Sequence, residues 1–84
     1  MLSACAAQTF HNIIPEKWFA LKAKAAQNNI SLIGDAGQAT QQGFTFSWQY
    51  DAATATLTIQ CLDHPFWATC GSINSRVHDI IEAG

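Results

Sequence analysis

The sequence predicts a small two-layer α+β domain. In it, an antiparallel sheet of three or four strands carries an N-terminal and a C-terminal helix on one face. Two segments that alternate apolar and polar residues flank a short turn, and two helical patterns lie on either side of them. The chain has 84 residues and is 49% hydrophobic, which is enough for one domain with a core of its own. Residues 1–12 have no clean period and are expected to form a loose arm or an extra helical turn.

The two alternating segments are residues 44–50, FTFSWQY, and residues 55–61, ATLTIQC. Alternation with a period of two is typical of strands that bury one face, and the intervening DAAT reads as a four-residue turn. A hairpin with this turn places every apolar residue of both strands on the same face. The predicted pairs are Tyr50 with Ala55, Trp48 with Leu57, Phe46 with Ile59, and Phe44 with Cys61.

Helices are predicted over residues 14–28 and 72–83. In the first, Trp18 and Leu21 recur at helical spacing, and Pro15 suits the first turn, where its missing N–H is not needed. In the second, Ser72 is the expected N-cap. The apolar stripe of the second helix is formed by Ile73, Val77, Ile80 and Ile81.

Two further strands complete the predicted sheet. Residues 65–70, PFWATC, are the expected third strand, which turns Phe66 and Cys70 inward and Trp67 outward. Residues 30–33 are a candidate fourth strand or, alternatively, the exit from the first helix. The Gly- and Gln-rich residues 34–43 between the first helix and the hairpin are expected to form a flexible loop.

Charge is scarce, because Asp, Glu, Lys and Arg together make up only 12% of the chain and the net charge is −2. The four basic residues are scattered, so we expect no nucleic-acid binding, which depends on clustered cations that neutralise phosphates. No stretch approaches the roughly 18 apolar residues of a membrane span. The three cysteines are an odd number, which argues against a full disulfide framework. A cytoplasmic location without a membrane partner is therefore the expectation, and no cofactor is indicated.

Cysteine and histidine residues suggest a second kind of site. Cys61, His64, Cys70 and His78 follow the pattern C-x2-H-x5-C-x7-H, which is a candidate zinc site although the second pair is widely spaced. Cys61 and Cys70 could instead form a disulfide, or stay as two buried thiols in a reducing compartment. Cys70 just before a helix, with His64 or His78 as a base, is a candidate thiol nucleophile, although no reaction class is indicated.

The leading functional prediction concerns the polar side of the hairpin. Its hydroxyl and amide groups carry no charge, so they can pair with another surface without desolvating ions. Trp67 would join this surface as a contact anchor if the third strand forms. We therefore predict a small non-enzymatic domain that binds or self-associates, as a homodimer, through its sheet. A third hypothesis places a small apolar ligand between the first helix and the aromatic face of the hairpin. Packing of the same aromatic rings in the core is the interpretation that the sequence favours over this ligand. The residues of the predicted binding surface are Thr45, Ser47, Gln49, Thr56, Thr58, Gln60 and Trp67.

Overall fold

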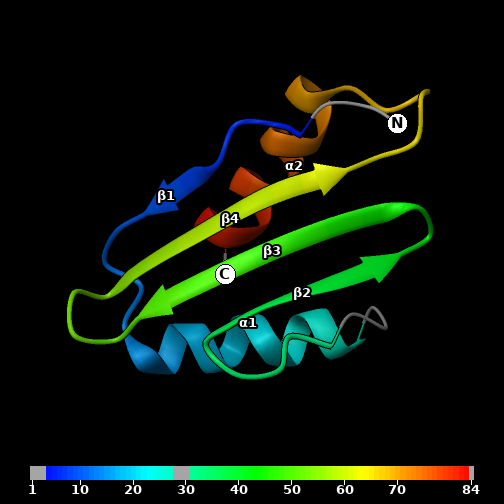
Figure 1. The fold of residues 1–84 in the computed structure, drawn as a ribbon. Coiled ribbons are helices and arrows are strands. Elements are labelled where there is room, and N and C mark those ends of the chain that lie inside the picture. The colour runs from blue at the N-terminus through cyan, green and yellow to red at the C-terminus, as the bar shows by residue number, and fades with distance from the viewer. Residues whose placement is uncertain (1–3, 28–30, 84) are drawn as a thin grey trace.

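Four antiparallel strands form one sheet in the order β1-β4-β3-β2 in the computed structural model, which describes residues 4–27 and 31–83 (Figure 1). Two helices interrupt and follow the strands along the chain. Within the described ranges, neither helix is long and apolar enough to cross a bilayer. The elements in chain order are β1 (Gln8–Phe10), α1 (Pro15–Gln27), β2 (Ala36–Gln41), β3 (Phe44–Asp51), β4 (Thr56–Asp63) and α2 (Cys70–Ala83).

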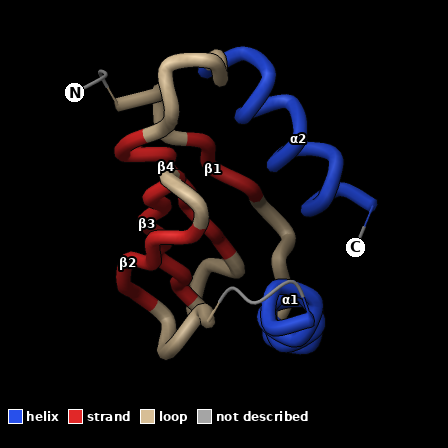
Figure 2. The backbone as a smooth tube through the Cα atoms, turned by 90° about the vertical axis from the view of Figure 1, so that its right-hand side faces the viewer, coloured by secondary structure: helices blue, strands red, loops and turns tan. Residues whose placement is uncertain are grey.

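Both helices lie on the same side of the sheet, and no helix of the described residues covers the other side (Figure 2). We call the helix-covered side the inner face and the opposite side the outer face. Trp48, Tyr50 and Leu57 are buried on the inner face, where they pack with Trp18 and Leu21 of α1. The structure is thus a small compact α+β domain, and the predicted fold class is confirmed.

The predicted hairpin forms, but its register differs from the prediction by two residues. Tyr50 pairs with Leu57 instead of Ala55, and Trp48 pairs with Ile59. The turn lies one residue later than expected, at residues 52–55, because the Asp51 side chain accepts a hydrogen bond from the Ala53 N–H at 2.9 Å. A shift of two residues leaves every side chain on its predicted face, so the inner face keeps its rings.

Strand β2 forms within the segment that was predicted to be a flexible loop. Its inner-face positions include Gly37 and Ala39, which are too small to produce a visible apolar alternation. Gly37 pairs with Trp48, and a Cβ atom on it would lie 3.0 Å from the indole ring, so glycine leaves room for that ring. The turn to β3 consists of Gln42 and Gly43 with φ of 53° and 87°, the positive values that two-residue type I′ hairpins require.

The N-terminal arm is part of the sheet, which corrects the prediction that residues 1–12 form a loose arm or a helical turn; residues 1–3 lie outside the described part. Strand β1 pairs with β4, with Phe10 opposite Leu57. The Gln8 side chain donates a hydrogen bond to the Asn74 carbonyl of α2 at 3.1 Å. The Asn74 side chain donates in turn to the Ala6 carbonyl at 3.3 Å, so side-chain hydrogen bonds join the arm to α2.

Helix α1 confirms the first predicted helix, although the expected end at residue 28 lies outside the described residues. The side chains of Trp18 and Leu21 are buried, as the pattern predicts. The indole N–H of Trp18 donates to Asp35 at 3.0 Å, and its ring stacks on Tyr50 with centroids 5.1 Å apart. The Tyr50 hydroxyl donates to the Ile13 carbonyl at 2.7 Å, which connects the segment just before α1 to β3.

Helix α2 begins at Cys70, two residues before the predicted start. The N-cap is Thr69 instead of Ser72, because the Thr69 hydroxyl accepts the hydrogen bond of the Ser72 N–H at 3.2 Å. The helix therefore includes the end of the predicted third strand, and residues 65–70 form no strand. Phe66 is 88% exposed instead of inward-facing. Residues 31–33 likewise form no strand, and residue 30 lies outside the described part.

Candidate functional site

A groove of about 390 Å³ lies between the two helices over the inner face. It exists because α1 and α2 cover different parts of the sheet, as Figure 2 shows. Residues of α1, α2, β2, β3 and β4 contribute to its lining, which is mainly apolar. Leu32, Phe46 and Val77 are half-buried along it, and Ile80 is 43% exposed at its border. Cavities of this size, about 300–1,000 Å³ with apolar walls, are typical of small-molecule sites.

Polar groups gather where the groove opens. Lys24 of α1 and Arg76 of α2 both line it, and they are two of the four basic residues in the chain. A shallower hollow of about 470 Å³ shares these two residues with the groove and adds Ser72, Ser75 and Asp79. The opening therefore combines two cations, two hydroxyl groups and one carboxylate. Such a border favours a ligand that carries a negative group at one end.

Trp48 forms part of the groove wall and has an unsatisfied polar atom. Its ring packs against Gly37, and its indole N–H is buried without an acceptor among the described residues. A buried donor without a partner costs about 1–3 kcal/mol. Of the two tryptophans that line the groove, Trp18 has a hydrogen-bond acceptor in Asp35 and Trp48 has none among the described residues.

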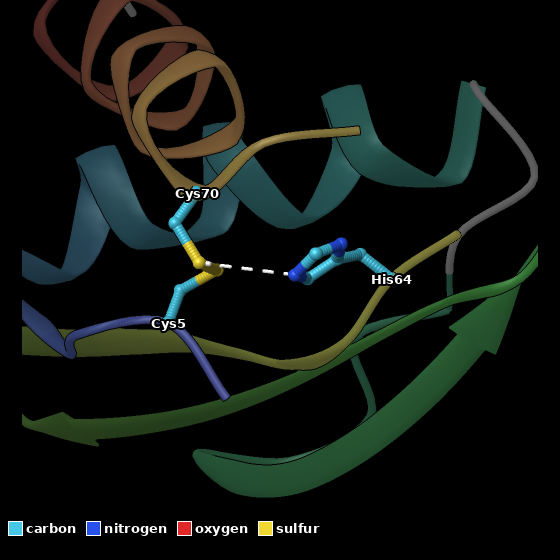
Figure 3. A group of neighbouring side chains, drawn as sticks. All are labelled: Cys5, His64 and Cys70. Atoms are coloured by element: carbon cyan, nitrogen blue, oxygen red, sulfur yellow. Dashed lines mark hydrogen bonds between the residues drawn. A yellow bond between two sulfur atoms is a disulfide. The ribbon is translucent and has the colours of Figure 1, made fainter. Parts of the chain in front are cut away.

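A second candidate site, formed by Cys5, His64 and Cys70, lies near the C-terminal end of β4 (Figure 3). Cys5 and Cys70 form a disulfide across 65 positions of the chain. The Nε2 atom of His64 lies 3.8 Å from the Cys70 sulfur. The disulfide corrects the expectation that Cys61 and Cys70 are either bridged to each other or both free thiols.

The His64 ring is oriented by the backbone. Its Nδ1 atom lies 3.0 Å from the Pro65 carbonyl oxygen, which can only accept a hydrogen bond, so Nδ1 donates. In the neutral ring, Nε2 then carries a lone pair and faces the sulfur. A disulfide sulfur has no proton to donate, so the 3.8 Å approach in the oxidised chain is a contact without a shared proton. Cys70 is also unavailable as the predicted thiol nucleophile in this state.

Cys61 is the remaining free thiol, and it is buried. It packs in the same apolar cluster as Cys5, and its thiol donates to the Asp63 carbonyl at 3.2 Å. Burial raises the pKa of the Cys61 thiol, and the nearby Asp63 charge adds to the increase, while the hydrogen bond to the Asp63 backbone opposes it. Cys61 is therefore a structural thiol with little thiolate character at neutral pH.

The predicted metal set is only partly brought together. His64 and Cys70 lie in one group of possible ligands, but the third member is Cys5, and the described residues give no group that contains Cys61 or His78. His78 is on the exposed side of α2, where its ring contacts Phe10 and its Nδ1 lies 3.8 Å from Asp79. Sequence reasoning missed Cys5 because no spacing rule connects residues 65 positions apart.

The predicted polar surface lies on the outer face of β3 and β4. Of its members, Gln49 is exposed, and Thr45, Ser47, Thr56 and Thr58 are half-buried. Gln60 is already engaged, because its side chain donates to the Cys5 carbonyl at 2.8 Å. Trp67 is 67% exposed but lies in the turn after β4, where it meets Phe44 edge-on, since the strand that would align it with this surface is absent.

Comparisons with family models, with curated proteins and with solved structures give no match to this chain. The function is therefore argued from the geometry of the groove, the outer face and the Cys5–His64–Cys70 cluster.

Proposed function

We propose that the chain is a small non-enzymatic binding domain whose groove holds an amphipathic carboxylate with an unbranched apolar tail. The observation that carries this proposal is the apolar groove between the helices with basic residues at its opening. It develops the hypothesis that an apolar ligand lies between the first helix and the aromatic strand face. In the structure that space is only partly filled by core side chains.

The tail supplies most of the binding energy in this proposal. Each methylene group moved from water into an apolar site contributes about 0.8 kcal/mol, and ordering the chain offsets part of that gain. The head group supplies selectivity, because Arg76 and Lys24 approach it from different helices. Both cations are exposed at least in part, so each contributes at most about 1 kcal/mol. For a tail of about ten carbons these contributions sum to about 8–10 kcal/mol. Association costs at least about 4 kcal/mol, so the expected dissociation constant lies between tens of micromolar and about a millimolar.

Dodecanoate is the first probe, used below its critical micelle concentration and followed by calorimetry and tryptophan fluorescence, since Trp18 and Trp48 line the groove. We expect one molecule per chain. Arg76→Gln should weaken dodecanoate roughly fivefold, because it removes one exposed ionic contact, and should leave dodecanol binding unchanged. Ile80→Gln should weaken both ligands roughly tenfold. Ile14→Gln is the matched control, since Ile14 is 52% exposed and does not line the groove.

Two results would contradict this proposal. If neither dodecanoate nor dodecanol binds, the groove is not a binding site for such ligands. An equal loss in the Ile80→Gln and Ile14→Gln variants would show that binding is nonspecific adsorption to apolar surface.

The second candidate function is self-association, in which two copies of the chain form a homodimer through their outer faces. The observation that favours it is the outer face of β3 and β4, which no helix of the described residues covers (Figure 2). Its central positions carry hydroxyl and amide groups, and the Asp51 carboxylate lies at the end beside the turn. Strand β2 is the edge strand next to β3. A net charge of −2 gives little repulsion between copies.

Light scattering at micromolar concentration tests this candidate. A dimer mass is expected for the native chain and a monomer mass for Thr58→Arg, which places a charge in the centre of the outer face. Thr54→Arg is the matched control, because Thr54 lies in the exposed turn before β4. A monomer at all concentrations would exclude this candidate. A dimer lost in Ile80→Gln but kept in Thr58→Arg would instead place a second copy on the groove.

The Cys5–Cys70 disulfide also bears on the cellular location of the chain. The sequence predicts the cytoplasm, yet disulfides persist mainly in oxidising compartments. We propose that the chain with the Cys5–Cys70 disulfide is located in an oxidising compartment, and that a cytoplasmic chain would have both cysteines reduced.

A further inference from the structure

The Cys5–His64–Cys70 cluster places three metal-ligand atoms together from three separate segments. The two sulfur atoms and one imidazole nitrogen all lie within 4.8 Å of one another (Figure 3). Two cysteines and one histidine are a common ligand set for zinc with one open position. Tetrahedral zinc places its sulfur ligands at about 2.3 Å and its nitrogen ligands at about 2.0–2.1 Å from the metal, so small side-chain movements suffice to surround an ion.

The positions of these ligands do not depend on the disulfide alone. The Cys5 N–H donates to the Cys61 carbonyl at 2.9 Å, and the Cys5 carbonyl accepts from the Gln60 side chain at 2.8 Å. Both backbone polar groups of Cys5 are thus bound to β4. The preceding hydrogen bonds between the arm and α2, made by Gln8 and Asn74, add two more connections. Opening the disulfide therefore leaves Cys5 next to its partners.

The other two ligands are also held from outside the cluster. His64 is anchored by its N–H, which donates to the Asp63 carboxylate at 2.9 Å, and by Nδ1, which donates to the Pro65 carbonyl. This second contact leaves Nε2 as the ligating atom and is the usual arrangement of a metal-binding histidine. Cys70 is fixed as the first residue of α2 by the Thr69 cap.

We infer that the cluster is a redox-controlled zinc site, closed to metal when Cys5 and Cys70 are bonded and competent when they are reduced. An external dithiol reductant supplies two electrons and two protons to the Cys5–Cys70 disulfide. The bond between Cys5 and Cys70 breaks to give two thiols, and the reductant is itself oxidised to a disulfide. The two cysteine thiols then lose their protons to solvent as Zn²⁺ binds both sulfur atoms and the His64 Nε2. Water occupies the fourth position. The two thiolates balance the charge of the ion, which makes a partly buried site acceptable.

The test compares oxidised and reduced chains. Protein reduced with dithiothreitol, desalted under argon and mixed with zinc sulfate should retain one zinc per chain after a second desalting, while the oxidised chain should retain none. Substituting Co²⁺ should give thiolate-to-metal charge-transfer absorption and tetrahedral visible bands. His64→Gln should weaken zinc at least about tenfold. Circular dichroism on the same samples records whether each chain is folded.

Matched variants distinguish this site from the ligand set predicted from the sequence. His78→Gln and Cys61→Ala should bind zinc as the native chain does, because neither residue belongs to the cluster. Cys5→Ser and Cys70→Ser should each lose the charge-transfer band of one thiolate. Equal zinc binding by the oxidised chain, equal losses in His78→Gln and His64→Gln, or no zinc bound by the reduced chain whether folded or not, would each overturn the inference.

Discussion

Replacing Cys5 and Cys70 together by serine is expected to lower the free energy of unfolding by about 4 kcal/mol. The disulfide closes a loop of 65 positions, and the chain-entropy estimate for a loop of this length is about 4 kcal/mol. A domain of this size has a total stability of about 4–13 kcal/mol, at roughly 0.05–0.15 kcal/mol per residue. The variant should therefore lose a large share of its stability, because its unfolded chain is no longer constrained by the bridge.

Urea unfolding followed by circular dichroism measures this loss, with native protein kept oxidised. Cys61→Ala serves as the control for loss of a cysteine without loss of the bridge, since Cys61 is free and buried. We expect it to cost about 1 kcal/mol through packing alone. A loss of less than 1 kcal/mol in the double variant would contradict the chain-entropy estimate for a loop of 65 positions.

Leu57→Ala is expected to destabilise the domain by about 3–5 kcal/mol, the range for truncating a fully buried leucine. Leu57 is 0% exposed and stands in β4 between Phe10 of β1 and Tyr50 of β3, so three strands lose contacts with it. It also lines the groove, so the deleted atoms add to an existing space that the surrounding rings fill incompletely. Little relaxation is available, and the cost falls at the upper part of the range.

Leu62→Ala on the same strand is the matched comparison. Leu62 is only half-buried and lies outside both apolar clusters, so its truncation should cost about 1 kcal/mol. Urea midpoints with unchanged slopes give both values. Equal losses for the two leucines would mean that the core is not organised around Leu57, contrary to the structure.

Turn chemistry explains how far the sheet could be predicted. Residues 44–50 and 55–61 alternate so regularly that both faces were identified correctly, yet the register was wrong by two residues. Alternation is insensitive to a two-residue shift, and the Asp51 hydrogen bond to Ala53 decided the turn. Strand β2 was missed because Gly37 and Ala39 lie under large rings of β3. The Gln42-Gly43 pair just before an alternating strand was the available signal for that hairpin.

The candidate sites depended on longer-range information. His64 and Cys70 were identified from their spacing, but their partner Cys5 was not, because its proximity results from the pairing of β1 with β4. Trp67 was assigned to a strand over residues 65–70. That strand does not form, because Thr69 caps a helix that begins at Cys70. The groove was anticipated only as a hypothesis, since its existence depends on how far apart α1 and α2 lie.

By itself, the sequence determined the two helices, the central hairpin and which hairpin residues share a face. These features follow from local periodicity and composition, which act over a few residues. The tertiary structure alone decided the Cys5–Cys70 pairing, the orientation of His64, the paired arm and the space between the helices. Each of these requires segments distant along the chain to meet, and that meeting is set by the combined packing of the whole core, not by any single segment.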